Sequence, residues 1–209
     1  MRIFISGGCK NGKSYYSQYL AKAQGASSLY YVATMRPVDG EDEKRIARHR
    51  DERDGWGFTT IEQPVDIEGI LGKCNPEGSF LLDSLTALLA NEMFLPDGSV
   101  NENAADKIID GLRLILAEIG NIVLVSDYIY SDAMVYDSFT ENYRMALAAI
   151  DREAARLCDT VLEAAYTNIV VHKAGAGFRG LNPVGDDAQD ARASRTRSVR
   201  PAHIVPRFA

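Results

Sequence analysis

The sequence has few cysteines, no excess of basic residues and no long apolar run, and each scarcity narrows the possible functions. Its three cysteines, Cys9, Cys74 and Cys158, stand far apart without Cys-x-x-Cys spacing, which disfavours a disulfide framework and favours a reducing compartment. The formal net charge of -6 disfavours nucleic acid or an anionic membrane as the main partner. No signal peptide and no run of 18 apolar residues is present, so we expect a cytoplasmic protein with no membrane span.

The rest of the composition is that of an ordinary globular protein. Hydrophobic residues make up 46% and charged residues 25% of 209 positions, enough for one domain with a sizeable core. The apolar periodicity extends over residues 1–173, which we expect to form the folded domain. Over residues 174–209, Gly, Pro, Asp and Arg dominate and the periodicity stops. This change predicts a flexible tail, with a functional basic arm as the alternative.

Short apolar segments alternate with segments of helical periodicity along residues 1–173. The segments expected to contain strands are 2–6, 28–34, 58–63, 79–83, 121–127 and 160–173. The segments expected to be helices are 13–24, 40–57, 66–74, 84–94, 102–119 and 138–158. Strands that are apolar throughout and alternate with helices predict an α/β fold, in which helices flank both faces of a mostly parallel central sheet.

The segment GGCKNGKS, residues 7–14, matches the phosphate-binding pattern G-x-x-x-x-G-K-S between a predicted strand and a predicted helix. Glycines allow a tight turn whose amide N–H groups bind phosphate oxygens at the helix N-terminus. Lys13 is expected to reach the β and γ phosphates, and Ser14 to bind Mg²⁺ through its hydroxyl. The chain is therefore expected to be a P-loop NTPase of the RecA-like type. The predicted nucleotide-binding residues of the loop are Gly7, Gly8, Cys9, Lys10, Asn11, Gly12, Lys13 and Ser14.

Cys9 in the loop and the aspartates at two strand ends each have two possible interpretations. Cys9 is a reactive thiol or simply a small residue that fills a loop position, and the second interpretation is the simpler one. A P-loop also needs a carboxylate for its metal at the end of a neighbouring strand. Asp83, which closes SFLLD, is the first candidate, and Asp127, which ends NIVLVSD, is the second. The alternative for each is an aspartate that caps the following helix.

A histidine among arginines marks the segment EKRIARHRDERDGW. On a helix, Arg45 and Arg53 would lie four residues on either side of His49 and share its face. Nearby cations disfavour the imidazolium form, so the ring is expected to be neutral near pH 7. A neutral imidazole can attack phosphorus while arginines hold the phosphate oxygens. The alternative is a solvated helix of mixed charge.

The order of GGCKNGKS, YYVATM, DEKRIARHRDERDGWGFTTIEQP and FLLDSLTALLANEMF resembles the bifunctional adenosylcobinamide kinase / adenosylcobinamide-phosphate guanylyltransferase family. The resemblance is good over the first 95 residues and looser to residue 173. It implies a nucleotide-binding and transferase domain that phosphorylates adenosylcobinamide with ATP or GTP. It also implies transfer of GMP from GTP through a guanylylated histidine, and a homo-oligomer of three chains.

Carried over residue by residue, the resemblance makes His49 the histidine nucleophile and places Arg53 and Glu62 near the nucleotide. It assigns Asp83 to the strand-end acid, with Ser14 as the other metal ligand and Lys13 as a catalytic residue. The expected partners are therefore small corrinoid and nucleotide substrates with Mg²⁺.

The chain also departs from the family pattern. Lys10 and Asn11 stand where Arg-Ser is usual, Asp83 where glutamate is common, and Ser126-Asp127-Tyr128-Ile129 where Asn-Glu-Val-Gly is usual. These departures leave two alternatives open. One is a paralogue with kinase activity alone or with another small hydroxylated acceptor, and the other is a nucleotide-binding regulator without turnover.

Overall fold

The computed structural model describes residues 1–37, 40, 54–130, 134–166 and 168–178. They form a seven-stranded sheet in the order β3-β2-β4-β5-β1-β6-β7. All neighbouring pairs are parallel except β6 and β7, which are antiparallel. The strands are β1 (Arg2–Gly7), β2 (Leu29–Ala33), β3 (Thr59–Glu62), β4 (Ser79–Asp83), β5 (Asn121–Asp127), β6 (Thr160–Ala165) and β7 (Asn168–Lys173). The predicted mostly parallel sheet is confirmed.

Four α-helices and one 3-10 helix accompany the strands in the described part of the chain. They are α1 (Lys13–Ala23), η1 (Ile67–Gly72), α3 (Leu85–Met93), α4 (Ala104–Glu118) and α5 (Ser138–Leu157). The helix expected over 66–74 is thus a shorter 3-10 helix. Most of the helix expected over 40–57 lies outside the described residues. None of the described helices combines the length and apolar character that crossing a membrane requires.

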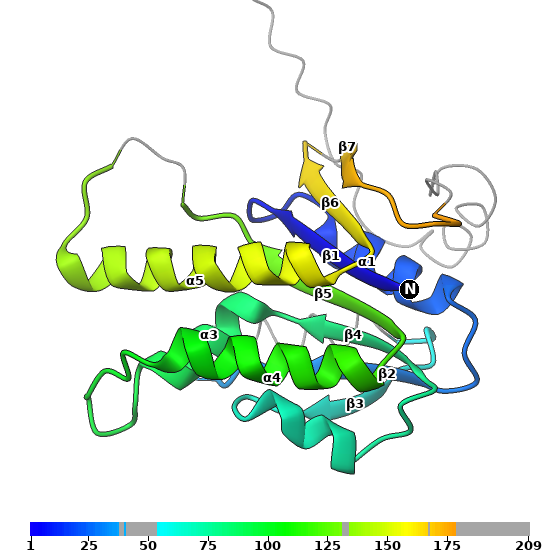
Figure 1. Cartoon of the computed structure of the whole chain (residues 1–209), viewed down its shortest axis with the longest axis horizontal. Coiled ribbons are helices and arrows are strands. Elements are labelled where there is room, and N and C mark those ends of the chain that lie inside the picture. Colours follow the sequence, from blue (N-terminus) through cyan, green and yellow to red (C-terminus); the bar gives the residue numbers. More distant parts are fainter. Residues whose placement is uncertain (38–39, 41–53, 131–133, 167, 179–209) are drawn as a thin grey trace, which may run out of the picture. The chain divides into compact units, whose positions relative to one another are not determined.

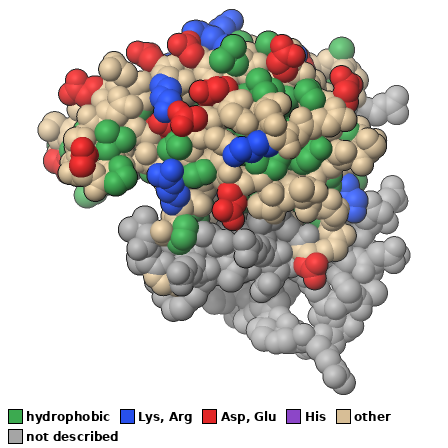
Figure 2. Space-filling view, turned by 90° about the horizontal axis from the view of Figure 1, so that it is seen from below, with side chains coloured by type: hydrophobic (Ala, Val, Ile, Leu, Met, Phe, Trp, Pro, Cys, Tyr) green, Lys and Arg blue, Asp and Glu red, His purple; other side chains and the backbone are tan. Residues whose placement is uncertain are grey.

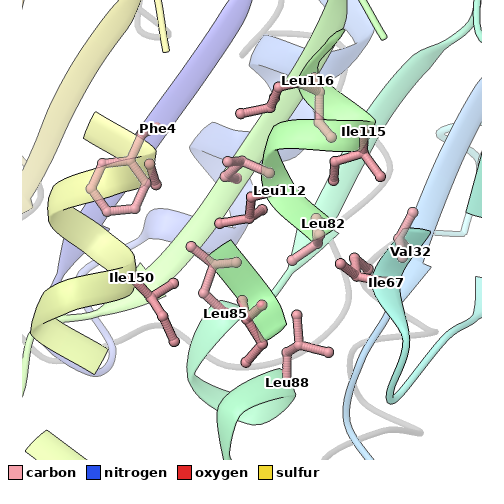
Figure 3. Packing of buried hydrophobic residues seen from close by; sticks show 14 of the residues in the cluster. Phe4, Val32, Ile67, Leu82, Leu85, Leu88, Leu112, Ile115, Leu116 and Ile150 are labelled. Carbon is pink, nitrogen blue, oxygen red and sulfur yellow. The ribbon is translucent and has the colours of Figure 1, made fainter. Parts of the chain in front are cut away.

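Helices cover both faces of the sheet, with α3, α4 and α5 in front and α1 behind in Figure 1. The strand β5 is buried at its five central residues, because a central parallel strand faces helices on both sides. Side chains alternate along each strand, so Phe4 and Leu82 point to the face of α3, α4 and α5. There they pack with Leu85, Leu112 and Ile150, as Figure 3 shows.

The amphipathic pattern of α4 explains its place over this core. Ile108, Leu112 and Ile115 recur at helical spacing, and all three are fully or almost fully buried.

On the face drawn in Figure 2, acidic and basic side chains are interspersed over the described surface.

The topology gathers the predicted phosphate loop and both candidate carboxylates at one edge of the sheet. Because β1, β4 and β5 are parallel, their carboxyl ends meet at this edge. Gly7 at the end of β1 is in register with Asp127 at the end of β5. Asp83 lies one strand further away, since β5 separates β4 from β1. A parallel α/β sheet binds ligands outside the carboxyl ends of its strands.

Candidate nucleotide site at the carboxyl edge of the sheet

The segment 7–14 connects β1 directly to α1 through a tight turn. Gly12 has a φ of 83° and precedes the first helical residue, Lys13, a conformation that glycine adopts without strain. A Cβ atom at Gly7 would lie 2.3 Å from the carbonyl oxygen of Ala164 on β6, so only glycine fits there. Asn11 donates its side-chain N–H to the same carbonyl at 3.0 Å. The loop is therefore fixed against β6 by close approach and by a hydrogen bond.

Lys13 points back into the loop, and its side chain is only 7% exposed. Its Nζ atom donates to the carbonyl oxygens of Gly7 at 2.8 Å and Gly8 at 2.7 Å. A third contact, of 2.9 Å, joins Nζ to Oδ1 of Asp127. The lysine that is predicted to bind phosphate is thus already paired with a carboxylate of the protein, that of Asp127.

The backbone of Asp127 is held from two sides. Its amide N–H donates to Oγ1 of Thr86 on α3 at 2.9 Å. The next residue, Tyr128, donates its amide N–H to the Gly7 carbonyl at 3.0 Å. These contacts place the Asp127 carboxylate beside the loop, because β5 is the immediate neighbour of β1.

Asp83 occupies a separate position at the same edge. Tyr31 on β2 donates its hydroxyl to Oδ2 of Asp83 at 3.0 Å. The N-cap of α3 is Ser84, whose side chain accepts from the amide of Ala87 at 3.2 Å. The capping alternative therefore does not hold for Asp83. It does not hold for Asp127 either, because the N-cap of the following helix, α5, is Asp137.

The donor set at this edge fits Mg²⁺. The hydroxyl of Ser14 and the carboxylates of Asp83 and Asp127 offer hard oxygen ligands, the type that Mg²⁺ prefers. No group of three or more His, Cys, Asp or Glu side chains arranged for a metal occurs within the described ranges. A P-loop metal does not need such a group, because phosphate oxygens and water complete its coordination.

The other predicted site residues are not all brought to the loop. Glu62 is exposed at the end of β3, four strand positions from β1. At about 4.8 Å per position, this separation is roughly 19 Å. Cys9 and Lys10 are exposed at the turn, and Lys10 has a positive φ of 59°. His49 and Arg53 lie outside the described residues.

The chain re-enters the described fold next to α1. Trp56 makes an edge-to-face contact with Tyr15, with ring centroids 5.6 Å apart. The Nζ atom of Lys22 lies 5.5 Å from the centroid of the Trp56 ring, within range of a cation–π interaction. Trp56 thus packs on the helix that directly follows the phosphate loop.

The sequence patterns did not identify Asp151 on α5, whose carboxyl lies close enough to Asp127 to be affected by its charge. Asp151 is buried, and Tyr130 donates its hydroxyl to Oδ2 of Asp151. Burial, with a further contribution from the charge of Asp127, raises the pKa of Asp151 to about 7. Burial and the same Asp127 charge raise the pKa of Tyr143 to about 12. Tyr143 donates its hydroxyl to the Thr86 carbonyl at 2.9 Å.

A sequence signal for Asp151 did exist. It stands four residues after Leu147 and three before Ala154, and both of these residues are fully buried in the core. An aspartate on the apolar face of a helix is expected to be neutral or paired, because burial of an unpaired charge is costly.

Comparison with known proteins yields one family and several relatives. The sequence model of the family described as cobinamide kinase / cobinamide phosphate guanyltransferase matches residues 3–167. The bifunctional adenosylcobalamin biosynthesis protein CobP of Pseudomonas aeruginosa is 33% identical over 128 residues, 61% of this chain and 71% of that protein. The bifunctional adenosylcobalamin biosynthesis protein CobU of Salmonella typhimurium is 23% identical over 172 residues, 77% of this chain and 93% of that protein. Among solved structures, the RadB recombinase matches with a TM-score of 0.44 and 15% identity, over 86% of this chain and 83% of that one.

Proposed function

The chain belongs to the cobinamide kinase / cobinamide phosphate guanyltransferase family, and from that premise we propose that it catalyses both reactions. It phosphorylates adenosylcobinamide with ATP or GTP, and it transfers GMP from GTP to the resulting phosphate. The single observation that carries the proposal is the loop between β1 and α1, whose Lys13, the first residue of α1, lies at the edge that also bears Asp83 and Asp127.

In the kinase step, the loop amides and Lys13 bind the triphosphate. The hydroxyl oxygen of the aminopropanol arm attacks the γ-phosphorus in line and gives up its proton. The bond from that phosphorus to the β–γ bridging oxygen breaks, and the nucleoside diphosphate leaves with the electron pair. Lys13 offsets the charge that develops on the leaving oxygen. Ser14 and Asp83 would hold Mg²⁺, which when bound neutralises charge on the phosphates.

In the transfer step, a ring nitrogen of neutral His49 attacks the α-phosphorus of GTP. The bond to the α–β bridging oxygen breaks, and pyrophosphate leaves. A phosphate oxygen of adenosylcobinamide phosphate then attacks the histidine-bound GMP, the P–N bond breaks, and adenosylcobinamide-GDP is released. Arg53 would hold phosphate oxygens during this exchange.

We assign Glu62 to this transfer step and not to the phosphate loop. Its place on β3, roughly 19 Å from β1 by strand spacing, is too far away for contact with phosphates bound at residues 7–14 of the same chain. A homo-oligomer, in which a second chain contributes to the site, would bring the two positions together. Residues 1–173 would carry both activities in the cytoplasm, with residues 174–209 as a tail.

Labelled GTP tests the proposal. With GTP labelled at the α-phosphorus, we expect label on His49, in a bond that is acid-labile and base-stable, as a phosphoramidate is. With GTP labelled at the γ-phosphorus, we expect label on adenosylcobinamide. His49→Ala should lose the first labelling and keep the second, whereas Lys13→Ala should lose the second.

His172→Ala is the matched control, because His172 is an exposed histidine on β7 that pairs with Glu163. It should retain both labelling reactions. Retention of GMP transfer in His49→Ala, with no label left on the protein, would contradict the histidine mechanism. Labelling of adenosylcobinamide by γ-phosphate alone would indicate a kinase without transferase activity. Binding of GTP without any product would indicate a regulator.

A further inference from the structure

The ammonium group of Lys13 is saturated by protein acceptors. It has three N–H donors and no acceptor, and three oxygens lie within 2.9 Å of Nζ, those of Gly7, Gly8 and Asp127. A phosphate oxygen can therefore bind Lys13 with full hydrogen bonding only if one of these partners leaves.

Asp127 is the partner that can leave. The Gly7 and Gly8 carbonyls belong to a loop whose backbone is fixed against β6, so they cannot withdraw without rebuilding the turn. The Asp127 backbone is also fixed, by Thr86 and by its register with Gly7, but its carboxylate can rotate about χ1. The Asp127 side chain is 21% exposed, so water can solvate it after release.

The negative charge of Asp127 is a second reason to expect that phosphate displaces it, and not a carbonyl, from Lys13. A carboxylate and a terminal phosphate are both anions, and they compete for the same ammonium. They cannot both lie close to Lys13 without repulsion between them, whereas neutral carbonyls add no such repulsion.

We propose that Asp127 is an exchange carboxylate. In the nucleotide-free protein it holds Lys13, and the terminal phosphates of a triphosphate displace it. Once it is released from Lys13, the carboxylate accepts the proton of the attacking hydroxyl in the kinase step. This second role rests on the proposed function, whereas the displacement itself does not.

Binding of triphosphate without metal tests the displacement. Calorimetry in EDTA, with inorganic triphosphate and separately with GTP, compares the wild type with Asp127→Asn. Loss of the competing carboxylate should tighten binding about tenfold, the effect of one charge-assisted hydrogen bond. Asp83→Asn is the matched control, because it removes the same charge from the same edge without a contact to Lys13. It should tighten binding less than about threefold by the same scale.

Several results would overturn the displacement. One is triphosphate binding by Asp127→Asn that is weaker than, or equal to, that of the wild type. Another is equal tightening in Asp127→Asn and Asp83→Asn, because this would indicate a general effect of removing negative charge. A structure of the wild type with inorganic triphosphate gives a second measurement that does not depend on folding of a variant. The Lys13 ammonium should then contact phosphate with Asp127 beyond 4 Å, and a retained Lys13–Asp127 pair would contradict the displacement.

Phosphorylation of adenosylcobinamide tests the second role. Asp127→Asn should lower kcat at saturating nucleotide by at least about a hundredfold, in the range expected for loss of a general base. An unchanged kcat would overturn the proton-accepting role. If the wild type does not phosphorylate adenosylcobinamide at all, the proposed function fails, and the binding comparison still decides the displacement.

Discussion

Asp151 gives the sharpest test of the electrostatics behind the site. The substitution Asp151→Asn keeps the shape of the side chain and removes its titration. In the folded protein, burial and the charge of Asp127 raise the pKa of Asp151 from its ordinary value of 3.8 to about 7. Between these two pH values the folded chain holds a proton that the unfolded chain has released. Stability from this group is therefore greatest below the unfolded pKa and is lost as pH rises toward 7.

The size of the effect follows from the displaced pKa. At 1.36 kcal/mol per pH unit, a rise of the pKa from 3.8 to about 7 corresponds to about 4 kcal/mol. Other groups titrate in the same range, so the useful quantity is the free energy of unfolding of Asp151→Asn minus that of the wild type. This difference should grow by up to about 1.4 kcal/mol per pH unit between pH 4 and pH 7, and level off above that.

Urea unfolding at a series of pH values, followed by circular dichroism, measures this difference. Glu102→Gln is the comparison variant, because it also replaces a carboxyl by an amide, at an exposed position. A flat difference for Asp151→Asn would refute the reasoning, because it would mean that the buried carboxyl titrates as an exposed one does.

Three further predictions concern the loop and the core. Gly7→Ala should lower triphosphate affinity at least about tenfold, measured by calorimetry, since its Cβ would lie 2.3 Å from the Ala164 carbonyl oxygen; unchanged affinity would contradict the close approach. Leu112→Ala should lower the free energy of unfolding by about 2–5 kcal/mol, because Leu112 is fully buried; a loss below about 1 kcal/mol in urea titration would place it outside the core. Ser84→Ala should cost about 1 kcal/mol in the same titration, because it removes the cap on Ala87; no loss would argue against that cap.

Most strands and helices, and the turn between β1 and α1, were predictable from sequence because each depends on a short segment. Apolar runs that alternate with helical periodicity give the strands and helices, and the P-loop pattern gives the turn between β1 and α1. The family resemblance is confirmed by the match over residues 3–167. The segment 160–173 was expected to contain one or two strands, and it forms the antiparallel pair β6 and β7.

The order of strands in the sheet could not be predicted in the same way. Asp83 and Asp127 both end apolar strands, and nothing local to either one says which strand lies next to β1. The sheet places β5 there, and so Asp127, the second candidate for the metal, is the carboxylate that contacts Lys13. Strand order depends on contacts between residues far apart in sequence, which periodicity does not encode. The metal role of Asp83 stays a prediction.

The function of the central histidine also stays a prediction from sequence, since His49 lies outside the described residues. The described fold adds the position of Trp56, which packs against Tyr15 and Lys22 of α1. That contact fixes where the chain returns after the arginine-rich segment, and it lies next to the loop that is proposed to bind nucleotide.

We propose that the amides of residues 7–14 bind the triphosphate of a nucleotide, and both proposed reactions depend on this binding. Titration of the ¹⁵N-labelled protein with GTP, followed by backbone amide resonances, tests it most directly. We expect the largest shifts on the amides from Gly8 to Ser14, and we expect Lys13→Ala to weaken the binding. Largest shifts on another part of the sheet, with these amides unchanged at saturation, would contradict it.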